Sequence, residues 1–216
     1  MEFGEDNSLE EAIQGMKMKI IDELNKSLPA HFSNDELVEM GLDKDREVIR
    51  LGAEMSQLPV ASTLLKQAID GNGDFQYYEN DSIVASGFKD SFHFKTQLLE
   101  LKNKIPPGGG MVMSGFVDFN KPYKGVSPTK DQHLSYGIVK TALLVRHNED
   151  GSMSYKGAIG DAYNFEAHEF KYDGSLSIYK NTYRLGVVII NNIAVIEQIL
   201  GNIKPFGWQA SVEGSI

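Results

Sequence analysis

The sequence predicts an α+β fold in which an N-terminal helical lobe packs on a C-terminal antiparallel β-sheet or partial barrel with one late helix. Apolar residues in the first half recur at helical spacings, whereas those in most of the second half alternate with a period of two. Between the halves, IPPGGG at 105–110 removes helix donors and frees the backbone. We therefore expect a helical lobe at 1–107 and a β-rich activity lobe at 108–216, within one compact unit.

Five helices are expected in the first half. Ser8 and Glu11 form a capping-box pattern at the start of the first helix. An apolar stripe with spacings of three and four follows, made of Leu9, Ile13, Met16, Ile20 and Leu24. Ser33 with Glu36 repeats the capping-box pattern, and Gly41 suits the end of that second helix. The other three predicted helices are 44–58, 61–69 and 91–105.

Strands and tight turns are expected after residue 110. The stretch MVMSGFVDF at 111–119 has strand character, and the segments 136–147 and 151–165 flank NEDG. Asp150-Gly151 within NEDG is a favoured hairpin turn, so we expect these two segments to pair.

The C-terminal part continues this pattern. A second Asp-Gly at 173–174 lies in an alternating stretch, and Trp208, Ala210 and Val212 alternate in a predicted last strand. Residues 184–200 are apolar, but four polar or charged residues interrupt them and they are shorter than the ~20 residues of a membrane span. We interpret this segment as a buried element, either a helix or a long strand; its length and the Asn191–Asn192 pair favour a helix that ends at Gly201.

Composition excludes or disfavours several kinds of site. The net charge of −9, without a basic run, disfavours binding to a phosphate backbone. Because the chain has no cysteine, it can form no disulfide, no thiolate zinc site and no cysteine nucleophile. The acidic start, MEFGEDNSLEE, has no apolar core and is not a signal peptide.

Two polar clusters are candidate sites. In GDAYNFEAHEF at 160–170, Asp161 and Tyr163 share a strand face and His168 follows five residues later. In PTKDQHLSYG at 128–137, Asp131 and His133 precede the strand that pairs with the first cluster's strand. Residues near 137 should then lie opposite residues near 161. An acid, a phenol and an imidazole together can bind a divalent cation or move a proton; the alternative is a pair of solvated strand ends.

The second half resembles a known family. A hairpin is followed by G-D-x-Y-N-F at 160–165, a nearby histidine, Arg-Leu-Gly at 184–186 before an apolar element, and a last strand. This order, over roughly 110–216, resembles the activity domain of colicin M-type bacteriocins and related C-terminal effector domains of polymorphic toxins. The resemblance implies a metal-dependent phosphoesterase that cleaves the lipid-linked peptidoglycan precursor, lipid II, between the polyprenyl chain and the pyrophosphate.

The family pattern is carried over residue by residue. Asp161 matches its first acid, Tyr163 its tyrosine and His168 its histidine. Asn164 stands where the family has a second acid, and Glu169 follows His168 where the family has an arginine. An asparagine offers a cation an oxygen without charge, and loss of the arginine removes a phosphate clamp.

The resemblance, taken together with the expected proximity of the two polar clusters, suggests roles for these residues. The predicted catalytic residues are Asp161, Tyr163, His168 and His133, and the predicted Mg²⁺ ligands are Asp161, Asn164 and Asp131. The histidines would assist proton transfer, and the tyrosine would orient the phosphate or the leaving group.

The implied partners are a cognate immunity protein and a lipid-linked substrate at a membrane surface, with no nucleic acid. The protein would be secreted or delivered into the periplasm of a target cell, without a signal peptide in this chain. Two alternatives stay open: another toxin hydrolase or nuclease, and a non-enzymatic immunity or binding protein whose acidity matches a basic partner.

Overall fold

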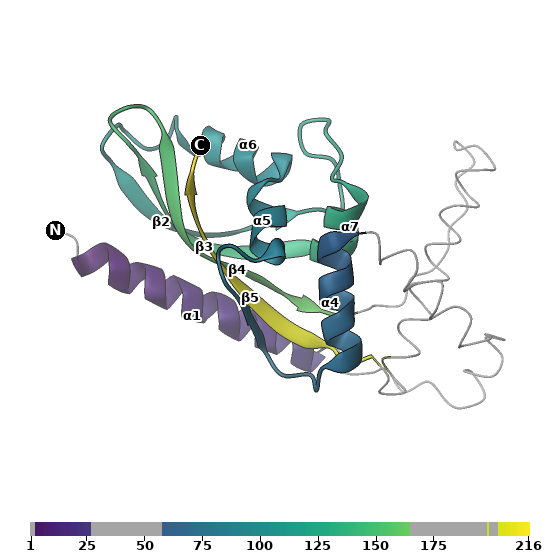
Figure 1. Cartoon of the computed structure of the whole chain (residues 1–216). Helices are drawn as coiled ribbons and strands as arrows, with labels where there is room; N and C mark the ends of the chain where they lie inside the picture. Colours follow the sequence, from purple (N-terminus) through teal and green to yellow (C-terminus); the bar gives the residue numbers. More distant parts are fainter. Residues whose placement is uncertain (1–2, 27–57, 165–197, 199–202) are drawn as a thin grey trace, which may run out of the picture.

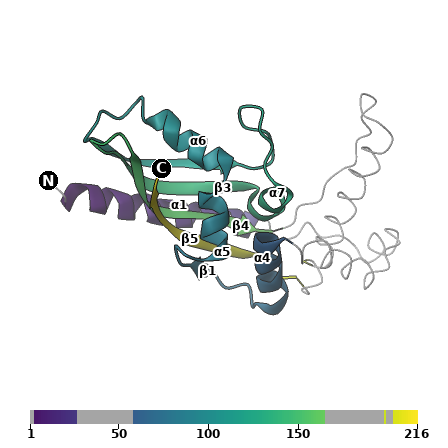
Figure 2. The ribbon, with the colours of Figure 1, turned by 45° about the horizontal axis from the view of Figure 1, so that its top comes forward.

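The computed structural model describes residues 3–26, 58–164, 198 and 203–216. In this part of the chain, helices cover both faces of one five-stranded sheet (Figures 1 and 2). The predicted second helix, all but the last residue of the predicted helix at 44–58, the predicted turn at 173–174, most of 184–200 and His168 lie outside the described residues. Among the described helices, none is long and apolar enough to cross a bilayer.

The predicted α+β class is confirmed, but the sheet is mixed and open rather than antiparallel throughout or barrel-like. Its strand order is β1-β5-β4-β3-β2. The strands are β1 Gln76–Tyr78, β2 Gly110–Asp118, β3 Ile138–His147, β4 Met153–Tyr163 and β5 Phe206–Ser215. All neighbours are antiparallel except β1 and β5, which pair in parallel. The difference arises because β1 comes from the first half of the chain and aligns beside the last strand.

The β3–β4 hairpin has the predicted turn. Gly151 has φ +85°, and its amide donates to the Asn148 carbonyl at 3.0 Å. The Asp150 carboxylate accepts from the Ser152 amide at 2.9 Å. The turn therefore joins two strands of opposite direction in a continuous register from His147–Met153 to Lys140–Gly160, and this register positions the candidate site.

Helix α1, Phe3–Lys26, covers one face of the sheet. It begins five residues before Ser8, so the capping-box pattern there does not mark its start. Ile20 is fully buried over a sheet surface of small residues. A side-chain carbon on Gly160 would lie 2.8 Å from Ile20 Cδ1, and one on Gly207 would lie 3.0 Å from Ile20 Cγ2. The helix can approach the sheet this closely because these positions carry no side chain.

Four helices cover the other face: α4 Pro59–Asp70, α5 Ile83–Lys89, α6 Phe92–Leu101 and α7 Lys130–Tyr136. The predicted helix at 61–69 corresponds to α4, and α6 lies within the predicted 91–105. An aromatic core lies between these helices and the sheet, made of Phe88, Phe94, Phe119, Tyr136 and Trp208. Elements from both predicted lobes therefore share one core.

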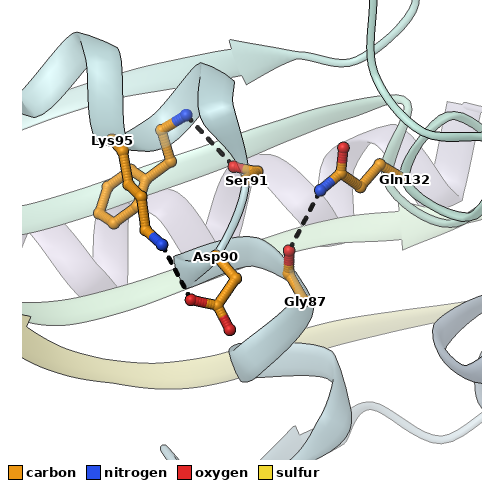
Figure 3. Close-up of polar contacts among 6 residues, drawn as sticks. Gly87, Asp90, Ser91, Lys95 and Gln132 are labelled. Carbon is orange, nitrogen blue, oxygen red and sulfur yellow. Dashed lines mark hydrogen bonds and ion pairs between the residues drawn. The ribbon is translucent and has the colours of Figure 1, made fainter.

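Three short elements, β1, α5 and α7, were not expected from the sequence. Helix α7 begins with a capping box between Thr129 and Gln132. The Gln132 side chain also donates to the Gly87 carbonyl of α5 at 3.5 Å, as Figure 3 shows. In the same view Lys95 forms an ion pair with Asp90 at 3.0 Å across the α5–α6 corner. These contacts hold α5, α6 and α7 against one another on this face of the sheet.

Candidate functional site

The strand register brings the two predicted clusters to the same end of the sheet. Lys140 lies opposite Gly160 in the β3–β4 ladder. Gly137 ends α7 with φ +53°, and a side-chain carbon at that position would lie 3.9 Å from the Asp161 carboxylate. The prediction that residues near 137 lie beside residues near 161 is confirmed.

Asp161 lies at the centre of a charged cluster at this end. Its carboxylate is 3.1 Å from the Lys140 ammonium, and both side chains are only 15% exposed. Lys140 also pairs with Glu23 of α1, whose side chain is 50% exposed. One ammonium group is thus shared by two carboxylates, one buried and one half in solvent.

Burial raises the pKa of Asp161 from its ordinary value of 3.8 to about 7, although the charge and hydrogen bond of Lys140 act to lower it. Glu23 adds to the increase because its negative charge opposes a second one nearby. Burial acts to lower the pKa of Lys140, but the two carboxylates more than offset it and raise that pKa. Lys140 therefore stays protonated while Asp161 exchanges its proton near neutral pH.

Asp131, a predicted metal ligand, caps helix α4. Its two carboxylate oxygens accept hydrogen bonds from the Val60 amide at 3.1 Å and the Ala61 amide at 2.8 Å. The local N-cap residue, Leu58, supplies no side-chain acceptor, so a carboxylate from α7 replaces it. A negative charge also suits the positive end of the helix dipole.

His133 and Tyr163 have well-defined surroundings. The Nδ1 atom of His133 lies 2.9 Å from the Phe119 carbonyl oxygen. Since a carbonyl can only accept, this contact requires the proton on Nδ1. Its ring is exposed. Tyr163 is buried and its ring packs 5.4 Å from that of Phe206. Burial, with a smaller contribution from Tyr78, raises the pKa of the Tyr163 phenol, so the group stays protonated.

The predicted residues are brought together only in part. Asn164 follows β4 directly and is half-buried, and His168 is outside the described residues. The oxygens of Asp131 contact α4, whereas Asp161 contacts Lys140. In the part of the chain that the structure describes, no three His, Asp or Glu side chains are grouped as a metal site. The described side chains alone do not compose a Mg²⁺ site, and the predicted ion stays a prediction.

Sequence reasoning missed Lys140 and Glu23. A signal for Lys140 was present, since it is a lone charge among the apolar residues of 138–145. A lysine in such a strand needs a carboxylate partner or a route to solvent. No comparable signal marks Glu23, because one acid on a charged helix is ordinary.

No model of a known protein family matches the chain, and no curated protein matches it. Among solved structures, it is similar to PaeM, a colicin M-like bacteriocin produced by Pseudomonas aeruginosa, at 14% identity and a TM-score of 0.34. It is also similar to truncated syringacin M, a bacteriocin from Pseudomonas syringae pv. tomato DC3000, at 11% identity and a TM-score of 0.32. Each similarity covers 73% of this chain, and 50% and 58% of those chains, respectively. The chain thus spans about half the length of the solved bacteriocin chains that it matches.

Proposed function

We propose that this protein is an antibacterial toxin with phosphoesterase activity toward a lipid-linked peptidoglycan precursor of the lipid II type. The observation that carries the proposal is Asp161, a largely buried carboxyl group beside Lys140 with a pKa of about 7. It lies in the segment at 160–165 that resembles the bacteriocin motif. Strongly perturbed pKa values with a specific charged partner are typical of reactive sites.

The chain's own residues suggest a division of roles. The Asp161 carboxylate accepts a proton from the water that attacks phosphorus, for which a pKa near the working pH is favourable. Lys140 offers a fixed positive charge near the phosphate, and Tyr163 stays the predicted group that orients the phosphate or the leaving group. The released polyprenol takes one proton and the pyrophosphoryl sugar keeps the hydroxyl of the water. His133 and His168 stay the predicted donors of that proton.

Hydrolysis of purified lipid II by purified protein tests the proposal. We expect release of a pyrophosphoryl-sugar product and loss of at least about a hundredfold in rate for Asp161→Asn. Asp150→Asn is a matched control, since it makes the same chemical change at the turn at the opposite end of the hairpin. Equal rates for the two variants would contradict a catalytic role for Asp161, and absence of product would reject the activity.

The same assay, with Mg²⁺ added or chelated, tests the predicted ion. An RNA-cleavage assay separates this proposal from a nuclease. In cells, export of the chain to the periplasm should stop growth, and a cognate immunity protein should restore it. An immunity protein would instead protect cells from a toxin, which is the opposite result.

A further inference from the structure

We propose that the outer edge of β2 pairs antiparallel with the same strand of a second copy of this chain, which makes a two-fold symmetric dimer with a continuous sheet. Strand β2 is a terminal strand of the sheet, and only β3 pairs with it among the described residues (Figure 1). This proposal concerns a surface and does not depend on the activity proposed above.

The length and regularity of β2 make it an open template for pairing. Nine consecutive residues of β2 pair with β3 in one register, without a bulge. The opposite terminal strand, β1, has three residues. Long, flat, unprotected edges readily pair with another strand, and proteins usually blunt them with bulges, lysines or prolines.

The backbone direction shows which residues of β2 face outward. The Phe119 amide donates to the Gly137 carbonyl at 2.7 Å, and the His147 amide donates to the Gly109 carbonyl at 2.9 Å. Gly109 and Phe119 lie just beyond the two ends of β2, in the same register with β3 as the strand itself. The odd-numbered residues of β2 are therefore the ones that form hydrogen bonds with β3. Since hydrogen-bonded positions alternate along an antiparallel strand, Val112, Ser114 and Phe116 direct their amides and carbonyls away from β3.

The side chains of β2 do not protect this edge. The strand, GMVMSGFVD, has no lysine, arginine or proline. Its one charge, Asp118, lies at its end and is paired with Lys121 at 2.8 Å. Phe116 is 61% exposed and Met111 is 40% exposed. Exposed aromatic and thioether side chains on a free edge favour association over solvation.

A second copy fits this edge because the strand is complementary to itself. In the antiparallel register with complete overlap, Ser114 lies opposite its own copy and Phe116 lies opposite Val112. Asp118 lies opposite Gly110, so no two like charges meet across the pair. The same surface serves both partners, as a two-fold interface requires. The net charge of −9 repels two copies at long range, so added salt should strengthen the dimer.

Sedimentation of the whole chain at low and high salt tests the proposal. We expect the wild type to form a dimer whose fraction rises with concentration and with salt. Ser114→Pro removes an outward amide that β3 does not use, and Phe116→Lys places a charge on the edge. Each should weaken the dimer at least about tenfold. Leu99→Lys makes the equivalent change at an exposed residue of α6 and should leave the dimer unchanged.

A single engineered thiol gives a second readout, because the chain has no cysteine of its own. Ser114→Cys should form a covalent dimer with a short bifunctional thiol reagent, whereas Leu99→Cys should not. This variant keeps the outward amide and so remains informative if Ser114→Pro fails to fold. A wild type that stays monomeric at every salt concentration, or edge variants that dimerise as well as the wild type, would overturn the proposal.

Discussion

The substitution Asp161→Asn should stabilise the protein at pH 8 and leave its stability almost unchanged near pH 4. In the wild type, the pKa of Asp161 is about 7 in the folded state, whereas the unfolded chain has the ordinary aspartate value of 3.8. The folded state therefore binds more protons than the unfolded state between these values, and the stability falls as pH rises through this window. Asparagine cannot ionise, so the variant lacks this decrease.

The magnitude follows from the same two values. A difference of roughly 3 in pKa corresponds to about 4 kcal/mol at about 1.4 kcal/mol for each tenfold change in proton affinity. We regard this as the upper end, because the side chain is 15% exposed and shares Lys140 with Glu23. The gain should be complete above pH 7, where Asp161 is ionised in both states.

Urea unfolding at a series of pH values measures this effect. Trp208, the single tryptophan, is fully buried in the aromatic core, so its fluorescence reports the loss of tertiary structure. The quantity to plot is the difference in unfolding free energy between variant and wild type, in which other titrating groups cancel. A difference that is flat with pH, or that favours the wild type as pH rises, would mean that the pairing with Lys140 outweighs burial and would refute the reasoning.

Four further substitutions test other parts of the structure. Lys140→Met should destabilise the protein by about 1–3 kcal/mol above pH 7, because a buried carboxylate loses its partner, and pH-dependent urea unfolding should show the pKa of Asp161 raised further. Asp131→Ala should cost about 1–2 kcal/mol in urea unfolding, equally with and without Mg²⁺, since the side chain caps α4; a loss that requires Mg²⁺ would instead indicate a metal ligand. Gly160→Val should cost about 1–3 kcal/mol in thermal unfolding, because its side chain meets the Trp208 carbonyl and Ile20, whereas Gly15→Ala on α1, where no described atom lies within 4 Å of the added carbon, should gain about 0.5–1 kcal/mol.

The sequence predicted the elements that are determined by residues close together in the chain. The Asp150-Gly151 turn and the alternation on each side of it fixed the β3–β4 register, and this register placed Asp161 near Gly137. Helix α7 was missed because its seven residues are too few to show periodicity, although Thr129 and Gln132 carry a capping-box arrangement. Strand β1 was missed because three residues do not make a pattern, and its pairing with β5 joins parts of the chain more than a hundred residues apart.

The candidate site was predictable in position but not in its contacts. Nothing in the order of residues shows that Asp131 contacts the amides of α4, because the distance along the chain to Ala61 is 70 residues. The same holds for Lys140 and Glu23, which are 117 residues apart and meet only because α1 packs on the sheet. Long-range partners of polar side chains depend on packing, and it is these partners that decide whether a carboxylate caps a helix or exchanges a proton.

The shared ammonium of Lys140 connects the docking of α1 to the chemistry of Asp161. Glu23 reaches this group from α1, and its charge raises the pKa of Asp161. By linkage, protonation of Asp161 must then favour the docked position of Glu23, since each event changes the free energy of the other by the same amount. Because Gly160 and Gly207 carry no side chain, Ile20 can pack closely on the sheet. This close packing holds α1 at the distance from the sheet at which Glu23 reaches Lys140. The small-residue surface of the sheet is thus part of what sets the proton affinity of the candidate catalytic carboxylate.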